Sequence, residues 1–296
     1  MYRVNKDCSD FRLVMYSKDG LLPCVRVHME KPHTAGKPII EQAAIDKNIA
    51  DNNGFLELDF LFQKGFKEPL RKSEPKFYKR IKDLDLESFV DKMMSLRDDA
   101  DHFALLRKEY KEAEKSIKEK RPIYWKEMLA ALSFAMNYPA KYLSAEDMLR
   151  LRNCLSSLIS VVIAFMPQRS CQVLLALHDA GRLALIADGG KGEVEVSRSS
   201  TITYSYADEA GQVHKDVYQA FVNCTGQEQI AVEDFPFRSL VADGTVHGAK
   251  LLFKSSRSKK RQRREKYRHR QRRYEPKWKI LLACCRDRHL RFFPTG

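Results

Sequence analysis

Apolar positions repeat with a helical period through the middle of the chain. Between about residues 77 and 120 they lie three or four residues apart, for example at Leu86, Phe89, Phe103 and Leu106. That spacing places apolar side chains on one face of a helix, which can then be buried against neighbouring helices. The pattern therefore predicts a block of packed helices in this part of the chain.

A second helical run follows, and its ends are recognisable. Ser144 is suited to be an N-cap, and Glu146 and Asp147 put negative charge into the first turn, where the helix dipole favours it. The apolar pattern continues until Pro167 interrupts it. A further short helix ends before Gly181, a residue that commonly follows a helix C-terminus.

After this glycine the period of the apolar pattern shortens to about two residues, which is typical of β-strands. Residues 194–198 and 201–207 alternate apolar and polar side chains, and residues 220–222 form a continuous apolar run. Near the N-terminus, residues 11–16 form another strand candidate, which a turn-rich Ser-Lys-Asp-Gly sequence closes. The alternation predicts strands with one exposed face, and the continuous run predicts a buried strand.

Residues 24–75 follow neither period. Pro32, Pro38, Pro69 and Pro75 are scattered among their apolar positions. Such a long irregular stretch inside a compact domain is usually a functional loop. We therefore expect an irregular loop here.

The net charge of the chain is concentrated at its C-terminal end. The whole sequence has 53 Lys and Arg against 39 Asp and Glu, a balance of +14. Residues 254–296 alone hold 17 basic and 3 acidic residues, so the preceding residues carry 36 of each sign. The composition separates a charge-balanced body from a basic tail, which we expect to be disordered.

The basic tail is a candidate for nucleic-acid binding. Residues 254–273 include 12 basic side chains that could neutralise phosphates, and Tyr267, Tyr274 and Trp278 could stack on bases. Such binding would be electrostatic and strongly salt-dependent. A nuclear-localisation-like signal and contact with an anionic membrane are alternatives. Within 254–279 the residues expected to contact nucleic acid are Lys259, Lys260, Arg261, Arg263, Arg264, Arg268, Arg270, Arg272 and Arg273.

Several kinds of chemistry are not supported. The seven cysteines include no Cys-x-x-Cys pair and the eight histidines show no His-x-x-x-His spacing, so we predict no metal site and no catalytic residue. Scattered cysteines are typical of a reduced, cytoplasmic protein. The longest uncharged stretch, residues 153–168, is shorter than the roughly 20 residues that a membrane helix needs. We expect a cytoplasmic protein without a membrane span.

Four segments of the body occur in an order that resembles a known family. They are 11–23 (FRLVMYSKDGLLP), 167–183 (PQRSCQVLLALHDAGRL), 218–227 (YQAFVNCTGQ) and 235–246 (FPFRSLVADGTV). They are similar to segments of FAD/NAD(P)-binding proteins related to flavin monooxygenases and amino-acid N-hydroxylases. The resemblance covers residues 9–247. It implies an α/β fold, a partial Rossmann-like dinucleotide-binding domain with a helical insertion and a β-meander.

The organisation implied has four parts. Residues 1–75 would begin a nested NAD(P)-binding-like domain, 76–180 would be the helical insertion, 181–250 would supply the β-meander and a returning strand, and 251–296 would be the basic tail. The function implied is that of a flavin-dependent, NAD(P)H-using oxidoreductase with FAD and NAD(P) as cofactors, in which the cofactors perform the hydride chemistry.

The resemblance also implies which residues bind the cofactor. Thr225 and Gly226, with Cys224 in the same turn, would approach the dinucleotide at the carboxyl end of a buried strand. Ser17 and Lys18 would meet an adenosine ribose or its 2′-phosphate. Since no partner base lies near Cys224 in the sequence, we expect a small buried cysteine there rather than a nucleophile.

The sequence also departs from that family. The flavin fingerprint Gly-x-Gly-x-x-Gly is absent, which removes the helix N-terminus that would hold a pyrophosphate. We therefore expect a fragment or a divergent member, with Met1 as an internal start and residues from about 248 onward read out of frame. A non-enzymatic protein-interaction module built on residues 77–180 is a further hypothesis, for which a pull-down with these residues is the direct test.

We predict that the chain neither retains FAD nor oxidises NAD(P)H by itself, because the loops that would bind the cofactors are missing. The visible absorption spectrum of the purified protein checks the first part, and an NAD(P)H oxidation assay checks the second. A soluble protein that shows the absorption band of oxidised flavin would contradict the prediction.

Overall fold

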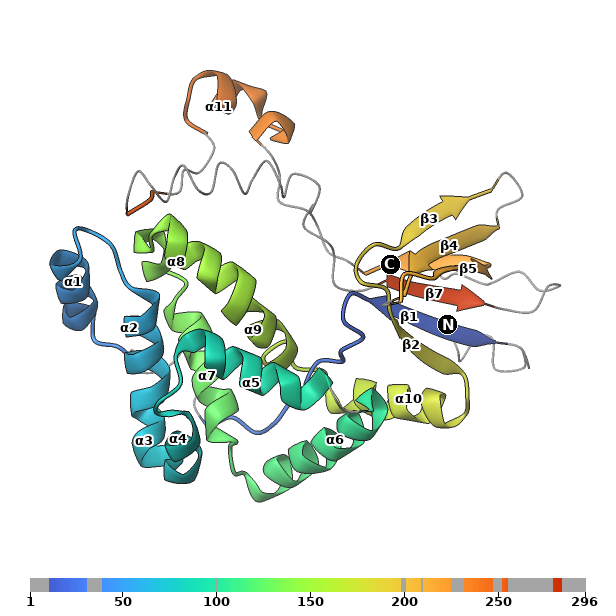
Figure 1. Ribbon diagram of the computed structural model, residues 1–296, viewed down its shortest axis with the longest axis horizontal. Coiled ribbons are helices and arrows are strands. Elements are labelled where there is room, and N and C mark those ends of the chain that lie inside the picture. The colour runs from blue at the N-terminus through green and yellow to red at the C-terminus, as the bar shows by residue number, and fades with distance from the viewer. Residues whose placement is uncertain are drawn as a thin grey trace. The chain divides into compact units, whose positions relative to one another are not determined.

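The chain is described by a computed structural model and forms two compact units (Figure 1). The helical unit consists of Leu22–Cys171 and Pro236–Arg270, and the sheet unit consists of Met1–Leu21, Gln172–Phe235 and Gln271–Gly296. Each unit has its own cluster of buried hydrophobic side chains. The structure describes residues 11–30, 39–98, 101–197, 201–208, 210–224, 232–246, 252–254 and 279–283.

Helices make up the helical unit, and most of them are short. Their bounds are α1 Gln42–Asp51, α2 Leu58–Phe62, α3 Glu68–Ser73, α4 Pro75–Ile81, α5 Leu86–Asp98, α6 His102–Glu119, α7 Tyr124–Ala135, α8 Ala145–Arg150, α9 Ser156–Val162 and α11 Arg238–Ala242. Two π-helical turns and one 3₁₀ turn also belong to the unit, namely η1 Gln63–Lys67, η3 Leu151–Leu155 and η2 Pro139–Tyr142. The helical block predicted over residues 77–120 is confirmed, because α4, α5 and α6 cover most of it.

The expectation of an irregular loop over residues 24–75 is wrong for much of that stretch. α1, α2, η1 and α3 lie there, and Phe62, Phe66 and Leu70 are buried. An uninterrupted series of four-residue steps drifts by about 40° per step around an α-helix, whereas a mixture of three- and four-residue steps does not, so the helical period is less clear here. The π-helical turn η1 has more residues per turn and returns these side chains to one face. Pro75 begins α4, where the missing N–H of a proline costs no hydrogen bond.

A cluster of aromatic rings lies in the core of the helical unit. Phe62 stacks on Phe66 with ring centroids 5.4 Å apart, and Phe89 of α5 packs on Phe66 at 5.0 Å. All three side chains are buried. Burial of an aromatic side chain stabilises a fold by roughly 1.5–3 kcal/mol. The cluster is therefore a main reason why α2, η1 and α5 pack together.

The sheet unit contains two small sheets. Its strands are β1 Arg12–Ser17, β2 Leu183–Ala187, β3 Glu193–Val196, β4 Ile202–Ala207, β5 Val213–Tyr218, β6 Ala220–Asn223 and β7 Lys279–Ala283. Most of α10 Gln168–Asp179 and the 3₁₀ turn η4 Val232–Asp234 also belong to it. One sheet has the strand order β2-β1-β7-β6 and the other the order β3-β4-β5. The strands predicted from the two-residue period are confirmed as β3 and β4. The continuous apolar run forms the strand β6, but the expectation that this strand is buried is wrong beyond its first residue, Ala220.

A Rossmann-like arrangement, which requires a mainly parallel sheet, is not confirmed. β1 and β2 are parallel, with Leu13 opposite Leu183. β7 runs antiparallel to both of its neighbours, β1 and β6. In this register Val14 of β1 and Phe221 of β6 both lie opposite Leu281. Among the described strands, β1 and β2 are the one parallel pair. The fold is a mixture of helices and small sheets.

Strand β7 lies within the basic tail. The sequence predicts disorder over 251–296, yet Lys279–Ala283 pairs with β1 on one side and β6 on the other. The prediction is wrong for these residues, because a short apolar run, Lys-Ile-Leu-Leu-Ala, pairs with strand edges that would otherwise lack partners.

Tyrosines form much of the core of the sheet unit. Tyr16, Tyr204 and Tyr218 are at most 5% exposed and cluster with Val14. The Tyr16 hydroxyl donates to Asp216 Oδ2 at 2.8 Å and lies 2.7 Å from the Tyr218 hydroxyl oxygen. Burial raises the pKa of Tyr218 to about 12. The hydroxyls therefore stay protonated at neutral pH and hydrogen-bond β1 of one sheet to β5 of the other.

The sheet unit should not tolerate a larger residue at Gly192, which lies against Tyr204. A Cβ atom there would lie 1.9 Å from the Tyr204 hydroxyl oxygen and 2.3 Å from the ring carbon that carries it. We expect Gly192→Ala to lower the free energy of unfolding by about 1–3 kcal/mol, because the overpacked ring must move. Urea unfolding followed by near-UV circular dichroism measures the loss. Lys191→Ala, at the adjacent exposed position, is the control; equal stability of the two variants would contradict the prediction.

Candidate functional site

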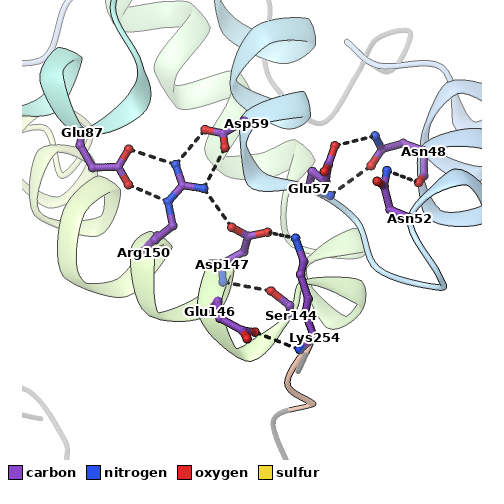
Figure 2. Close-up of polar contacts among 10 residues, drawn as sticks. All are labelled: Asn48, Asn52, Glu57, Asp59, Glu87, Ser144, Glu146, Asp147, Arg150 and Lys254. Carbon is purple, nitrogen blue, oxygen red and sulfur yellow. Dashed lines mark hydrogen bonds and ion pairs between the residues drawn. The ribbon is translucent and has the colours of Figure 1, made fainter. Parts of the chain in front are cut away.

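Arg150, the last residue of α8, is the centre of a polar cluster in the helical unit (Figure 2). Its Nε donates to Glu87 Oε1 at 2.6 Å, and its Nη2 donates to Glu87 Oε2 at 3.0 Å. Nη2 and Nη1 donate to the two Asp59 oxygens at 2.8 and 2.9 Å, and Nη1 also donates to Asp147 Oδ1 at 3.0 Å. Every N–H donor of the guanidinium therefore has a carboxylate acceptor.

The carboxylates come from the first turns of three separate helices. Asp59 lies in α2, Glu87 in α5 and Asp147 in α8, each where the helix dipole favours a negative charge. The N-cap predicted at Ser144 is confirmed, because its hydroxyl accepts the Asp147 N–H at 3.2 Å. Arg150 directly precedes the π-helical turn η3, a type of turn that is frequent at functional sites.

The cluster carries an excess of negative charge. Hydrogen bonds from Arg150 hold the pKa of Asp59 and of Glu87 below their usual range, and the same bonds raise the pKa of Arg150. All of these groups are therefore charged at neutral pH, and three carboxylates surround one guanidinium. Figure 2 shows Asp147 between Arg150 and a second cation, Lys254.

Lys254, the first residue of the basic tail, binds at the N-terminus of α8. Its Nζ lies 3.3 Å from Asp147 Oδ2, and its backbone N–H donates to Glu146 Oε2 at 3.2 Å. Just before it, the Leu252 carbonyl accepts the Ala145 N–H at 2.6 Å. Because side chain and backbone both take part, these contacts fix the start of the tail on the helical unit.

A second set of contacts joins α1, the start of α2 and the end of η2, and Figure 2 shows the part between Asn48 and Glu57. The Glu57 N–H donates to Asn48 Oδ1 at 3.1 Å, and Asn48 Nδ2 donates to Glu57 Oε2 at 3.4 Å. The adjacent Leu56 N–H donates to the Tyr142 carbonyl at 2.9 Å, and Leu56 forms a β-bridge with Leu143. The backbone at Tyr142 is therefore held against the helical core.

An exposed aromatic surface follows α7. Tyr138 is 65% exposed, and Tyr142 at the end of η2 is 37% exposed. The Lys141 ammonium lies 4.0 Å from the centroid of the Tyr138 ring and 5.0 Å from that of the Tyr142 ring. Cation–π attraction therefore holds both rings beside the lysine. These three residues are called the tyrosine–lysine surface.

A buried thiol in the helical unit is not suited to nucleophilic chemistry. Cys24 is 1% exposed, and its Sγ donates to Glu109 Oε1 at 3.3 Å. Burial raises the pKa of this thiol to about 12, so little thiolate is present at neutral pH. Arg97 of α5 donates to the same Glu109 carboxylate and, at 3.0 Å, to the Leu22 carbonyl. These contacts tie the chain at residues 22–24 to α5 and α6 and are structural.

The structure brings together the ends of the two strands that the sequence associated with a cofactor. Tyr16, which precedes Ser17, and Asn223, which precedes Cys224, both lie opposite Lys279 of β7. The ends of β1 and β6 therefore lie at the same edge of the sheet, about 10 Å apart across β7. The remaining two residues of the expected turn, Thr225 and Gly226, lie outside the described residues.

Cys224 is exposed, so the expectation of a small buried cysteine is wrong. Burial in β6 is confined to its first residue, Ala220, and the strand becomes exposed towards Asn223. A continuous apolar run is therefore no guarantee that the residue after it is buried.

The backbone of the turn after β1 has structural partners. The Ser17 carbonyl accepts the Asp188 N–H at 3.0 Å, and the Lys18 carbonyl accepts the Gly189 N–H at 3.1 Å. The Ser17 side chain is buried, whereas that of Lys18 is exposed. The Ser-Lys-Asp-Gly turn is thus accounted for by its pairing with the end of β2.

The sequence did not reveal the Arg150 cluster or the tyrosine–lysine surface. The nine basic residues expected to contact nucleic acid lie outside the described residues. Within the cluster, only the Asp147–Arg150 pair has a sequence signal, the i,i+3 spacing of opposite charges on a helix. Asp59 and Glu87 come from other helices, so only the tertiary structure brings them to Arg150.

Most of the helical unit matches a known family model. Residues 41–163 match the family model of the YdhS-like middle domain, a stretch that coincides with the run from α1 to α9. The chain is also similar to "Uncharacterized protein YdhS" of Escherichia coli (strain K12), with 24% identity over 230 residues. That alignment covers 77% of this chain and 41% of the E. coli protein, so the chain spans less than half the length of this relative. No solved structure matches the chain.

These comparisons overturn the resemblance to FAD/NAD(P)-binding monooxygenases and N-hydroxylases. The matches are to a YdhS-like middle domain and to an uncharacterised relative, so the assignments as flavoprotein and oxidoreductase are wrong. The segments that carried the resemblance are short strand–turn and helix–turn patterns, which many folds contain. The cofactor roles of Ser17, Lys18, Cys224, Thr225 and Gly226, and FAD and NAD(P) as cofactors, depended on the resemblance and lose their support with it.

Neither a membrane-spanning helix nor a metal-binding group is found in the part of the chain that the structure describes. No helix there is long and apolar enough to cross a bilayer. No group of three or more His, Cys, Asp or Glu side chains there could hold a metal ion. The carboxylates of the Arg150 cluster are paired instead with the protein's own cations, Arg150 and Lys254.

Arg150→Gln should destabilise the helical unit, because three carboxylates would lose a shared donor and repel one another. We expect the free energy of unfolding to fall by about 2 kcal/mol, less than for a fully buried ion pair because the side chain is partly exposed to solvent. Denaturant unfolding followed by far-UV circular dichroism measures the loss. Arg152→Gln, at an exposed position of η3, removes the same charge and should cost much less.

The cluster should also contribute to acid stability. The pKa of Asp59 and of Glu87 is lower in the folded state than the ordinary carboxyl value of about 4. Their stabilising contribution is therefore present above about pH 4 and is lost as the pH falls through the lower folded-state values. Arg150→Gln should lose less stability than wild type over this range. An unchanged acid dependence in Arg150→Gln would contradict this account.

Proposed function

We propose that the chain is a nucleic-acid-binding protein that acts through the basic residues of 254–279, with the helical unit as the scaffold for this tail. The observation that carries the proposal is the segregation of charge. The whole net charge of +14 lies in residues 254–296, beside a body whose charges balance.

Such a concentration of cations matches the chemistry of a phosphate backbone. Residues 254–273 contain 12 basic side chains, and each one that neutralises a phosphate releases a condensed counterion. Counterion release favours binding at low salt and makes the affinity fall steeply as salt rises. Because the body has no net charge, its long-range field would neither add to this attraction nor oppose it.

The contacts of Lys254 support the proposal that the helical unit is a scaffold for the tail. Its ammonium pairs with Asp147 and its N–H bonds to Glu146, while Leu252 bonds to Ala145. Lys254, the first basic residue of the tail, is therefore held at one place on the helical unit. Fixing this residue in advance lowers the conformational entropy that it would lose on binding.

We also propose a cytoplasmic location. The described cysteines Cys24, Cys154, Cys171 and Cys224 are free thiols, and unpaired, scattered cysteines are typical of proteins in a reducing compartment.

Neutralising the tail tests the proposal better than deleting it, because a deletion would also remove β7 from between β1 and β6. The variant changes five arginines to glutamine, namely Arg261, Arg263, Arg264, Arg268 and Arg270. Its affinity for a fluorescein-labelled oligonucleotide should fall strongly at low salt. The slope of log K against log salt should decrease by up to about 3.5 for a single strand, as expected when five phosphate contacts are lost. Fluorescence anisotropy over a salt series measures both.

The matched control removes the same charge from the body. It changes five exposed lysines of α6 and its C-cap to glutamine, namely Lys108, Lys111, Lys115, Lys118 and Lys120. This variant should bind nearly as wild type does. Equal losses in both variants, or wild-type binding by the tail variant, would contradict the proposal. A wild-type chain that binds no nucleic acid at low salt would exclude it and favour the protein-interaction hypothesis.

A further inference from the structure

We propose that the tyrosine–lysine surface, formed by Tyr138, Lys141 and Tyr142, is a base-stacking platform and that the preferred nucleic acid is therefore single-stranded. This inference rests on the proposed function, because it names the form of nucleic acid that the same protein binds. It assigns the stacking contacts and one phosphate contact, that of Lys141, to the helical unit and leaves the other phosphate contacts to the tail.

The first support is the exposure of the two rings. Tyr138 is 65% exposed and Tyr142 is 37% exposed, although both belong to a segment that packs closely on the core. Pro139, between the two tyrosines, and Leu143, directly after Tyr142, are buried. The segment is therefore well seated, and its tyrosines are directed outward by a fixed backbone rather than by a loose loop.

The second support is the lysine between the rings. The Lys141 ammonium lies 4.0 Å from the Tyr138 centroid and 5.0 Å from the Tyr142 centroid. Its contact with Tyr138 raises the pKa of Lys141, so the lysine is positively charged at neutral pH. Stacked bases are joined by phosphates, and a cation beside two aromatic rings offers each part of a nucleotide a partner.

The third support is the place where the tail begins. Tyr142 and Ala145 are three residues apart, so their Cα atoms lie within about 11 Å of each other. Ala145 is hydrogen-bonded to Leu252, and Lys254 begins the run of basic residues. A strand whose phosphates contact the start of the tail would therefore pass near Tyr142. Lys254 and Tyr142, far apart in sequence, both lie near the N-terminus of α8.

This arrangement favours a single strand over a duplex. In a duplex the faces of the bases are covered by their neighbours, so a protein without groove contacts binds mainly through phosphates. In a single strand the bases can be splayed out, and each offers a face to an aromatic ring regardless of sequence. The platform should therefore add affinity for a single strand and add little for a duplex.

The test uses the full chain, a fluorescein-labelled oligothymidine and a labelled duplex of the same length. The test variant is the double substitution Tyr138→Ala and Tyr142→Ala, and its matched control is Tyr138→Phe with Tyr142→Phe, which keeps both rings. The alanine variant should bind oligothymidine about 30-fold more weakly than wild type, as expected when two base-stacking contacts are lost, each at the lower end of the usual stacking energy. Its duplex affinity should change by less than about twofold, and the phenylalanine variant should bind both probes as wild type does.

The outcomes separate this inference from the proposed function. If wild type binds oligothymidine, neutralisation of the tail abolishes binding and the alanine variant binds as wild type does, the platform is wrong and the proposed function stands. An equal loss for single strand and duplex also overturns the platform. If wild type binds neither probe, the proposed function fails, and the platform fails with it.

A second measurement covers the case in which the alanine variant does not fold. Wild-type protein is irradiated with an oligonucleotide that carries 5-iodouracil, which cross-links to aromatic side chains in stacking contact, and the cross-linked peptides are mapped by mass spectrometry. Cross-links at Tyr138 or Tyr142 support the platform. Cross-links confined to other aromatic residues, such as Tyr267, Tyr274 or Trp278 of the tail, overturn it.

Discussion

The ion cluster around Arg150 is the polar interaction that fixes three helices of the helical unit relative to one another. Three helices present carboxylates to one point, and carboxylates that close together would repel one another without a cation between them. The guanidinium fits this position because its planar fork has five N–H donors, which give two hydrogen bonds each to Glu87 and Asp59 and one to Asp147, whereas a lysine ammonium has only three donors. Asp59, Glu87 and Asp147 thereby fix α2, α5 and α8 relative to one another.

The same cluster connects the helices that Arg150 holds together to Lys254, the first residue of the basic tail. Asp147 contacts Arg150 through one oxygen and Lys254 through the other, so a single carboxylate is shared by the fold and by the start of the tail. The Ser144 cap holds the backbone of Asp147 in place. The tyrosine–lysine surface precedes this cap by a few residues. The proposed phosphate-binding and base-stacking elements therefore begin from one short stretch of chain.

The elements that could be predicted from the sequence are those with an undisturbed local period. Such a period is present in the helices that contain Phe89 and Leu106 and in the strands β3 and β4. The Ser144 cap could be predicted as well, because it depends on residue types at neighbouring positions. The helices around Phe66 were missed because a π-helical turn lengthens the repeat, and β7 was missed because the charge around it dominates the composition. Short motifs at Ser17 and Cys224 suggested a cofactor site, although strand–turn patterns of this length are too common to identify a family.

The candidate site was less predictable than the fold, for a physical reason. A cap or an i,i+3 ion pair involves neighbours in sequence, so the pattern of residues reveals it. Apart from the Asp147–Arg150 pair, the cluster brings residues 59, 87 and 254 together with this pair across separations that carry no periodic signal.

By itself, the sequence determined the helical and strand periods, the N-cap and the segregation of positive charge into the tail, because these are local or additive properties of the chain. Only the tertiary structure decided which carboxylates share Arg150, where on the helical unit Lys254 is held and which tyrosines remain exposed. Those features depend on how distant segments pack, since long-range contacts form only when the whole core is assembled.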